Sequence, residues 1–119
     1  MIGKIKSKKA KVRMEYCVQV VKSSFTRDMF VELAEAEFNN KQNSAIEEVI
    51  VINSEAFGRM HGKDLPFSIK LDDTCKAIYI AYANKNGIVR IDCLIVNDID
   101  SDFEAELAEN KGIIRVVKD

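Results

Sequence analysis

Residues 76–97 read KAIYIAYA, NKNG and IVRIDCLIVN in succession, and this stretch decides the fold. Two runs rich in Ile, Val and Tyr flank the pair Asn86-Gly87, whose residues tolerate the positive φ of a tight strand reversal. The pattern predicts a β-hairpin, with its strands over 76–83 and 88–97. The other elements are placed outward from this hairpin.

The segment upstream of the hairpin reads as a β-α-β unit. Apolar and polar residues alternate over 12–20, which indicates a strand with one face in the core. Ser23 and Ser24 are candidate helix caps, and apolar residues at three- and four-residue spacing predict an amphipathic helix over 25–38. The continuous apolar run 49–52 favours a strand that is buried on both faces.

The connection between this unit and the hairpin contains Gly58, Gly62 and Pro66, which punctuate regular structure. We therefore expect a long connection over 53–66, with a helical turn around 54–57. The alternation of apolar and polar residues over 67–71 then predicts a further strand.

The segment after the hairpin is well punctuated. Ser101 with Glu104 three residues later forms a capping box, which predicts the start of a short helix. Residues 110–112 read Asn-Lys-Gly, a typical helix end, and an apolar run over 113–117 predicts a last strand.

These elements give the order β-α-β-β-β-β-α-β. The order predicts an α+β fold with a mostly antiparallel sheet of five to six strands and two helices on one face. An enlarged ferredoxin-like sheet is one way to satisfy it. The chain has 119 residues, of which 47% are apolar, so we expect one domain over 12–119 preceded by a basic N-terminal arm over 1–11.

Two features bear on the cellular compartment. No apolar run approaches the roughly 20 residues that span a bilayer, and no apolar segment follows the lysine-rich start. The three cysteines, Cys17, Cys75 and Cys93, lack C-x-x-C spacing, which favours reduced thiols over a disulfide framework. We expect a cytoplasmic protein without a membrane segment.

Charge is unevenly distributed along the chain. Residues 1–13 hold six basic residues and no acid, whereas the remainder holds 12 basic residues against 19 acidic ones. Such an arm can contact nucleic-acid phosphates. Its candidate contact residues are Lys4, Lys6, Lys8, Lys9, Lys11 and Arg13. A solvated tail that discourages edge pairing of the first strand is the alternative reading.

The acidic remainder suggests a surface for a basic partner protein. Dispersed acids that serve only solubility are the alternative. The candidate acidic residues lie on the two expected helices and just before the second: Glu32, Glu35, Asp98, Asp100, Asp102 and Glu106.

Other patterns offer weaker chemistry. Acids over 98–109 match a calcium-loop spacing, but Phe103 stands where that loop needs glycine, and acids also collect at helix N-termini. The loop residues Arg59, His61 and Lys63 could hold an anion, with the single histidine moving a proton. We assign no catalytic residue, metal ligand or cofactor.

We therefore expect a non-enzymatic protein-binding module, such as an inhibitor, immunity or accessory protein, encoded by a phage or a mobile element. It would act by occupying the surface of a partner. The first alternative is a nucleic-acid-binding accessory protein that uses the lysine-rich arm, and the second is a small enzyme that acts on an anionic substrate at the His61 loop. An open sheet also has edges through which a homodimer could form.

Overall fold

The computed structural model of the chain describes residues 13–40, 45–61 and 75–119. Within these ranges the side chains of residues 13–23 and 61 are outside the description. The elements, in chain order, are β1 (Arg13–Phe25), α1 (Arg27–Phe38), β2 (Glu48–Asn53), α2 (Ser54–His61), β3 (Lys76–Asn84), β4 (Gly87–Ile99), α3 (Ser101–Glu109) and β5 (Ile113–Val117).

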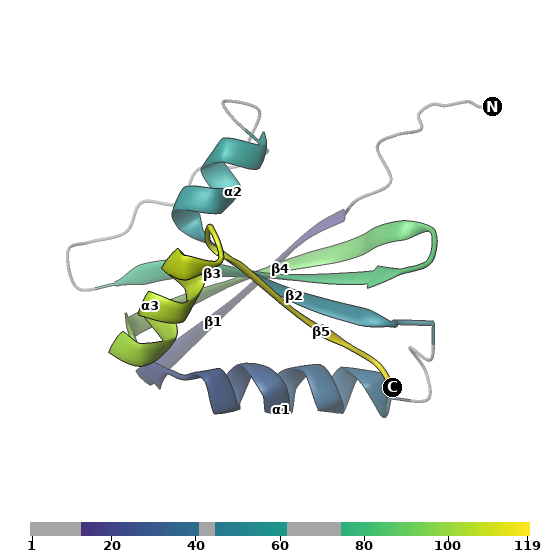
Figure 1. Ribbon diagram of the computed structural model, residues 1–119, viewed down its shortest axis with the longest axis horizontal. Coiled ribbons are helices and arrows are strands. Elements are labelled where there is room, and N and C mark those ends of the chain that lie inside the picture. The colour runs from purple at the N-terminus through teal and green to yellow at the C-terminus, as the bar shows by residue number, and fades with distance from the viewer. Residues whose placement is uncertain (1–12, 41–44, 62–74) are drawn as a thin grey trace.

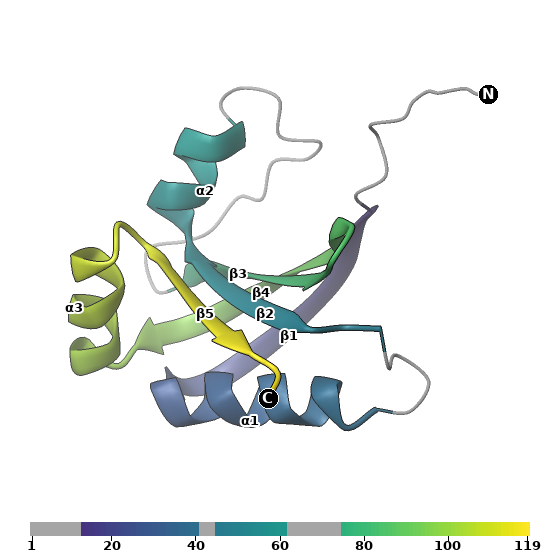
Figure 2. The ribbon, with the colours of Figure 1, turned by 45° about the vertical axis from the view of Figure 1, so that its right-hand side comes forward.

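The strands form one five-stranded sheet in the order β1-β4-β3-β2-β5. The pairings β4-β3, β3-β2 and β2-β5 are antiparallel, whereas β1 pairs with β4 in parallel. It follows that β1 and β2 run in the same direction, with β4 and β3 between them. Figures 1 and 2 show the curved sheet, with α1 and α2 on opposite sides of it.

The main core lies on the sheet face that α1 and α3 cover. It contains Phe30 of α1, Phe103 and Leu107 of α3, and apolar side chains of the three central strands. The Phe103 ring lies 6.0 Å from the Phe25 ring and 6.3 Å from the Phe30 ring, measured between centroids. These aromatic contacts connect α3 both to the end of β1 and to α1.

A second, smaller core lies on the opposite face, beneath α2. Ala56 and Phe57 of α2 pack there against Tyr79, Ala81 and other residues of β2, β3 and β4. The rings of Phe57 and Tyr79 are stacked, with their centroids 3.8 Å apart. Strand β2 contributes alternate residues to both cores, so the predicted burial of residues 49–52 on both faces is confirmed.

The prediction of an α+β fold is confirmed, while its finer details are only partly matched. The two expected helices do share one face, but α2 extends from the expected turn into a full helix on the other face. Three of the four pairings are antiparallel, in line with the mostly antiparallel sheet that we expected, whereas the parallel β1-β4 pair departs from a ferredoxin-like sheet. The strand expected over 67–71 lies outside the described residues.

The helix caps differ from the predicted ones by one to three residues. Strand β1 continues through Ser23 and Ser24, and Thr26 caps α1 through its Oγ1, which accepts a hydrogen bond from the Met29 N–H at 3.1 Å. Asp100 caps α3 and replaces the expected Ser101, because its carboxylate accepts from the Phe103 N–H at 3.3 Å.

The two predicted chain reversals are both present. In the hairpin, Gly87 adopts φ +117, and Asn84 Oδ1 accepts from the Asn86 N–H at 2.8 Å. Asn86 is not among the residues with positive φ, so Gly87 alone supplies the positive φ of this turn. After α3, Lys111 and Gly112 adopt φ +60 and +87, and β5 follows with the predicted bounds. No helix within the described residues has the length and apolar character needed to cross a membrane.

Candidate functional site

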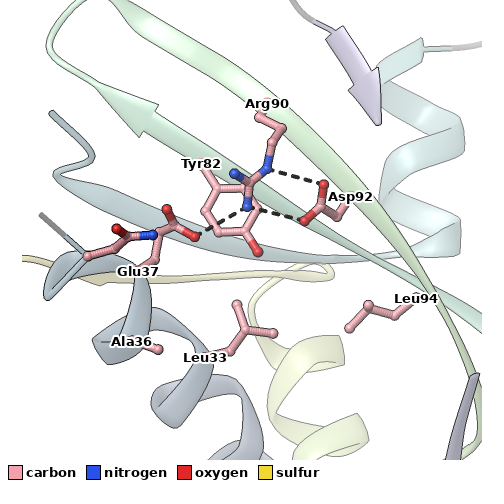
Figure 3. A pocket seen from close by; sticks show the side chains of 8 residues that line it. Leu33, Ala36, Glu37, Tyr82, Arg90, Asp92 and Leu94 are labelled. Atoms are coloured by element: carbon pink, nitrogen blue, oxygen red, sulfur yellow. Dashed lines mark hydrogen bonds and ion pairs between the residues drawn. The ribbon is translucent and has the colours of Figure 1, made fainter. Parts of the chain in front are cut away.

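A cleft opens on the main-core face between the C-terminal half of α1 and the hairpin strands β3 and β4 (Figure 3). We call it the Arg90 cleft. It encloses about 330 Å³ and is lined by Leu33, Ala36, Glu37, Asn40, Tyr82, Arg90, Asp92 and Leu94. Its lining is apolar toward the middle of the sheet and polar toward the hairpin turn.

Arg90 is the centre of an ion network in this cleft. Its Nη2 lies 3.2 Å from Glu37 Oε1 and 3.3 Å from Asp92 Oδ2. Its Nε lies 3.2 Å from Asp92 Oδ1 as an ion pair, without the alignment of a hydrogen bond. The Arg90 side chain is 30% exposed, against 11% for Glu37 and 17% for Asp92, so these charges are largely shielded from solvent.

The hairpin register places these residues together. Tyr82 pairs with Arg90 and Ile80 with Asp92, so all four side chains share one sheet face. The Arg90 guanidinium carbon lies 3.9 Å from the centroid of the Tyr82 ring, which gives a cation-π contact. Helix α1 adds Glu37 from its last turn, so the network ties α1 to the sheet.

Burial also controls the protonation of Tyr82, which is only 3% exposed. Burial first, and then the negative charge of Asp92, raise the pKa of its hydroxyl above the usual 10.0, while Arg90 acts in the opposite direction. Tyr82 therefore remains a neutral hydroxyl and cannot act as a base at physiological pH. The cleft therefore presents a neutral hydroxyl beside one guanidinium and two carboxylates.

The predicted acidic residues divide into two groups. Glu32 and Glu35 on α1 and Asp102 on α3 have exposed side chains. The other three make structural contacts: Asp98 lies 3.4 Å from the Lys76 ammonium, Asp100 caps α3, and Glu106 lies 3.3 Å from the Arg27 guanidinium. The Arg27–Glu106 ion pair joins the first residue of α1 to α3.

Four of the acids over 98–109 that match a calcium-loop spacing make structural contacts: Asp98, Asp100, Glu104 and Glu106. Asp98 and Glu104 both pair with Lys76, whose pKa is raised chiefly by its hydrogen bond with Glu104. Among the described residues, no three His, Cys, Asp or Glu side chains are grouped so that they could hold a metal ion.

The predicted anion-binding loop is only partly within the described residues. Arg59 lies on α2, where its Nη2 donates to the Lys111 carbonyl oxygen at 2.6 Å and its Nη1 lies 3.7 Å from Glu55. The backbone of His61 ends α2, but its side chain is not described, and Lys63 lies outside the described residues. Arg59 thus connects α2 to the turn before β5.

The basic arm lies almost wholly outside the described residues. Lys4, Lys6, Lys8, Lys9 and Lys11 fall before the first of them, and Arg13 begins β1 without a described side chain. Of the cysteines with described side chains, Cys93 is buried and Cys75 half-buried, and neither is part of a disulfide. Burial raises the pKa of the Cys93 thiol, which disfavours the reactive thiolate.

The sequence reasoning missed Glu37, Tyr82 and Arg90 as site residues. One signal was available: Arg90 and Asp92 occupy alternate positions of a strand whose next alternate residues, Leu94 and Val96, are apolar. Two charges in that register predict a polar site at one end of a buried face. The contribution of Glu37 required the tertiary structure, because it lies 53 residues from Arg90.

Comparisons with models of protein families, with curated proteins and with solved structures gave no match.

Proposed function

We propose that this chain is a non-enzymatic protein-binding module that presents the acidic outer surface of α1 and α3 to a partner with a basic surface. An inhibitor, immunity or accessory protein of a phage or mobile element would act in this way, by occupying its partner. The proposal rests on the charge of the two helices, which together carry six acidic residues with exposed side chains against one basic residue, Arg27.

The placement of these acids argues for a role beyond stability. Helix C-termini favour positive charge, yet neither α1 nor α3 has a basic residue in its last turn. Glu35 and Glu109 lie near those C-termini with exposed side chains, where their negative charge slightly destabilises the helices. A basic partner would compensate this unfavourable charge, and the summed negative field would also accelerate its association.

The test is affinity capture from nuclease-treated host lysate with two matched double variants. Glu32→Gln with Glu35→Gln removes two exposed charges from α1, whereas Glu47→Gln with Glu55→Gln removes two exposed charges outside α1 and α3. We expect the α1 variant to lose the captured protein and the control variant to retain it. Equal capture by both variants would reject the acidic surface as the binding site.

The two alternative functions remain predictions, and two further experiments test them. Capture from untreated lysate that depends on residues 1–11 and is lost in nuclease-treated lysate would indicate nucleic acid bound by the lysine-rich arm. Turnover of an anionic substrate that is abolished by His61→Ala would indicate a small enzyme.

A further inference from the structure

Strand β5 forms one edge of the sheet, where its outer side has no neighbouring strand among the described residues. Its pairing with β2 is regular from Ile113 to Val117. The opposite edge strand, β1, has two register shifts in its pairing with β4, and such irregularities discourage further strand addition. Strand β5 is therefore the edge that is suited to accept another strand.

The hydrogen bonds at both ends of the β2-β5 pair show which backbone groups of β5 point outward. The Asn53 N–H donates to the Gly112 carbonyl oxygen at 2.9 Å, and the Lys118 N–H donates to the Glu47 carbonyl oxygen at 2.8 Å. In an antiparallel pair the bonded residues alternate, so Ile114 and Val116 also face β2. The N–H and C=O groups of Arg115 and Val117 consequently point away from the sheet.

We propose that β5 is a homodimer interface, at which the β5 strand of a second copy pairs antiparallel about a two-fold axis at Val116. In this register Arg115 of each copy is opposite Val117 of the other. Each such pair exchanges two backbone hydrogen bonds, so the outward groups of all four residues are satisfied. The proposal is independent of the function proposed above.

The side chains of β5 complement those of a second copy in this register. Val116 meets its own symmetry mate in a pair without hydrogen bonds, where side chains approach most closely. Arg115 pairs with Glu48 of its own chain at 3.0 Å, which offsets its charge toward Arg115 of the second copy on one diagonal. Asp119 of the second copy lies on the other diagonal, within reach of the Arg115 side chain. A two-fold axis at Arg115 would instead place the two arginines opposite each other, which is unfavourable.

The exposed surface around β5 agrees with this arrangement. Val117 is 63% exposed, the most of the exposed large apolar side chains among the described residues. Arg115 lines a groove of about 220 Å³ together with Ile50, Ile113 and the half-exposed Met60. Val117 of the second copy would lie beside Arg115, at the rim of this groove.

The register is tested by two variants of opposite charge at one exposed position. Val117→Lys places a cation opposite Arg115 of the second copy, whereas Val117→Glu places an anion there. Light scattering coupled to size exclusion, over a wide concentration range, should show a dimer for the unmodified chain and for Val117→Glu. We expect the dissociation constant of Val117→Lys to be about tenfold higher than that of Val117→Glu, because each dimer contains two such pairs.

Two results would overturn the proposal: an unmodified chain that is monomeric at every concentration, or a dimer on which the two variants have equal effects. Amide hydrogen exchange supplies a check that does not depend on substitution. The amides of Arg115 and Val117 should gain protection as concentration rises, while those of Ile114 and Val116 should be protected throughout. Concentration-independent exchange at Arg115 and Val117 would equally contradict the dimer.

Discussion

Arg90 shows how much of this fold depends on one side chain. It holds Glu37 of α1 and Asp92 of β4 together, and both acids are largely shielded from solvent. Removing the guanidinium takes away the cation that pairs with both carboxylates. We expect Arg90→Ala to lower the free energy of unfolding by about 2 kcal/mol, less than for a fully buried pair because Arg90 is partly exposed. Urea denaturation measures this change.

The control for this substitution removes the acids first. In a background with Glu37→Gln and Asp92→Asn, Arg90 no longer pairs with these two carboxylates. There Arg90→Ala should lower the free energy of unfolding by less than half as much. An equal cost in both backgrounds would show that Arg90 stabilises the fold through packing on Tyr82 alone.

Tyr82 predicts how stability depends on alkaline pH. Because burial raises its pKa above 10.0 in the folded chain, an unfolded Tyr82 loses its proton at lower pH than a folded one. The contribution of this pKa difference to the free energy of unfolding is complete below about pH 10 and is lost as the pH rises further. Burial raises the pKa of Tyr79 and Cys93 in the same direction. In urea titrations from about pH 8 to about pH 11, the free energy of unfolding should fall less steeply with pH for Tyr82→Phe than for the unmodified chain. Identical slopes would refute the assignment.

At the scale of elements, the cap of α3 distinguishes the structure from the sequence pattern. Asp100 accepts the Phe103 N–H, whereas the sequence pattern predicts Ser101 in that role. Asp100→Ala should therefore cost about 1 kcal/mol of unfolding free energy, and Ser101→Ala should be nearly neutral. Chemical denaturation of both variants decides between the two caps. A larger loss of unfolding free energy for Ser101→Ala than for Asp100→Ala would identify Ser101 as the cap.

Gly112 is the glycine at which the turn after α3 is most constrained. Its φ is +87, and a Cβ there would overlap Asn53 Oδ1 and lie 2.7 Å from the Ala56 Cβ. Gly112→Ala should cost at least about 1–3 kcal/mol, because backbone strain and overpacking add. Gly58 in α2 is the matched control, since a Cβ there meets nothing within 4 Å and alanine favours helix. In thermal unfolding, the melting temperature of Gly112→Ala should be well below that of Gly58→Ala.

The elements with strong local patterns could be predicted from the sequence. The hairpin strands, the doubly buried β2 and the bounds of β5 follow from apolar runs and turn residues. The predictions of the cap residues were wrong because several Ser, Thr and Asp residues near each helix start are equally suited to that role. Helix α2 was predicted as a single turn because Gly58 interrupts its pattern, yet Phe57 stacking on Tyr79 stabilises the whole helix.

At the scale of the whole molecule, the sheet order could not be predicted. The parallel β1-β4 pair joins segments far apart in the chain, and no local signal specifies a pairing of this kind. The Arg90 cleft depends on the same long-range packing, which brings α1 against the hairpin. The acidic character of the two helices, in contrast, could be predicted from their residues. The structure adds the Arg27–Glu106 ion pair that joins the two helices.

The central claim is that the acidic surface of α1 and α3 contacts a basic partner. Zero-length carbodiimide cross-linking of the captured complex, followed by mass spectrometry of the linked peptides, tests it most directly. The account predicts links from the carboxylates of Glu32, Glu35 and Asp102 to lysines of the partner. Links confined to Glu47, Glu55 or Asp119, with none from α1 or α3, would contradict it.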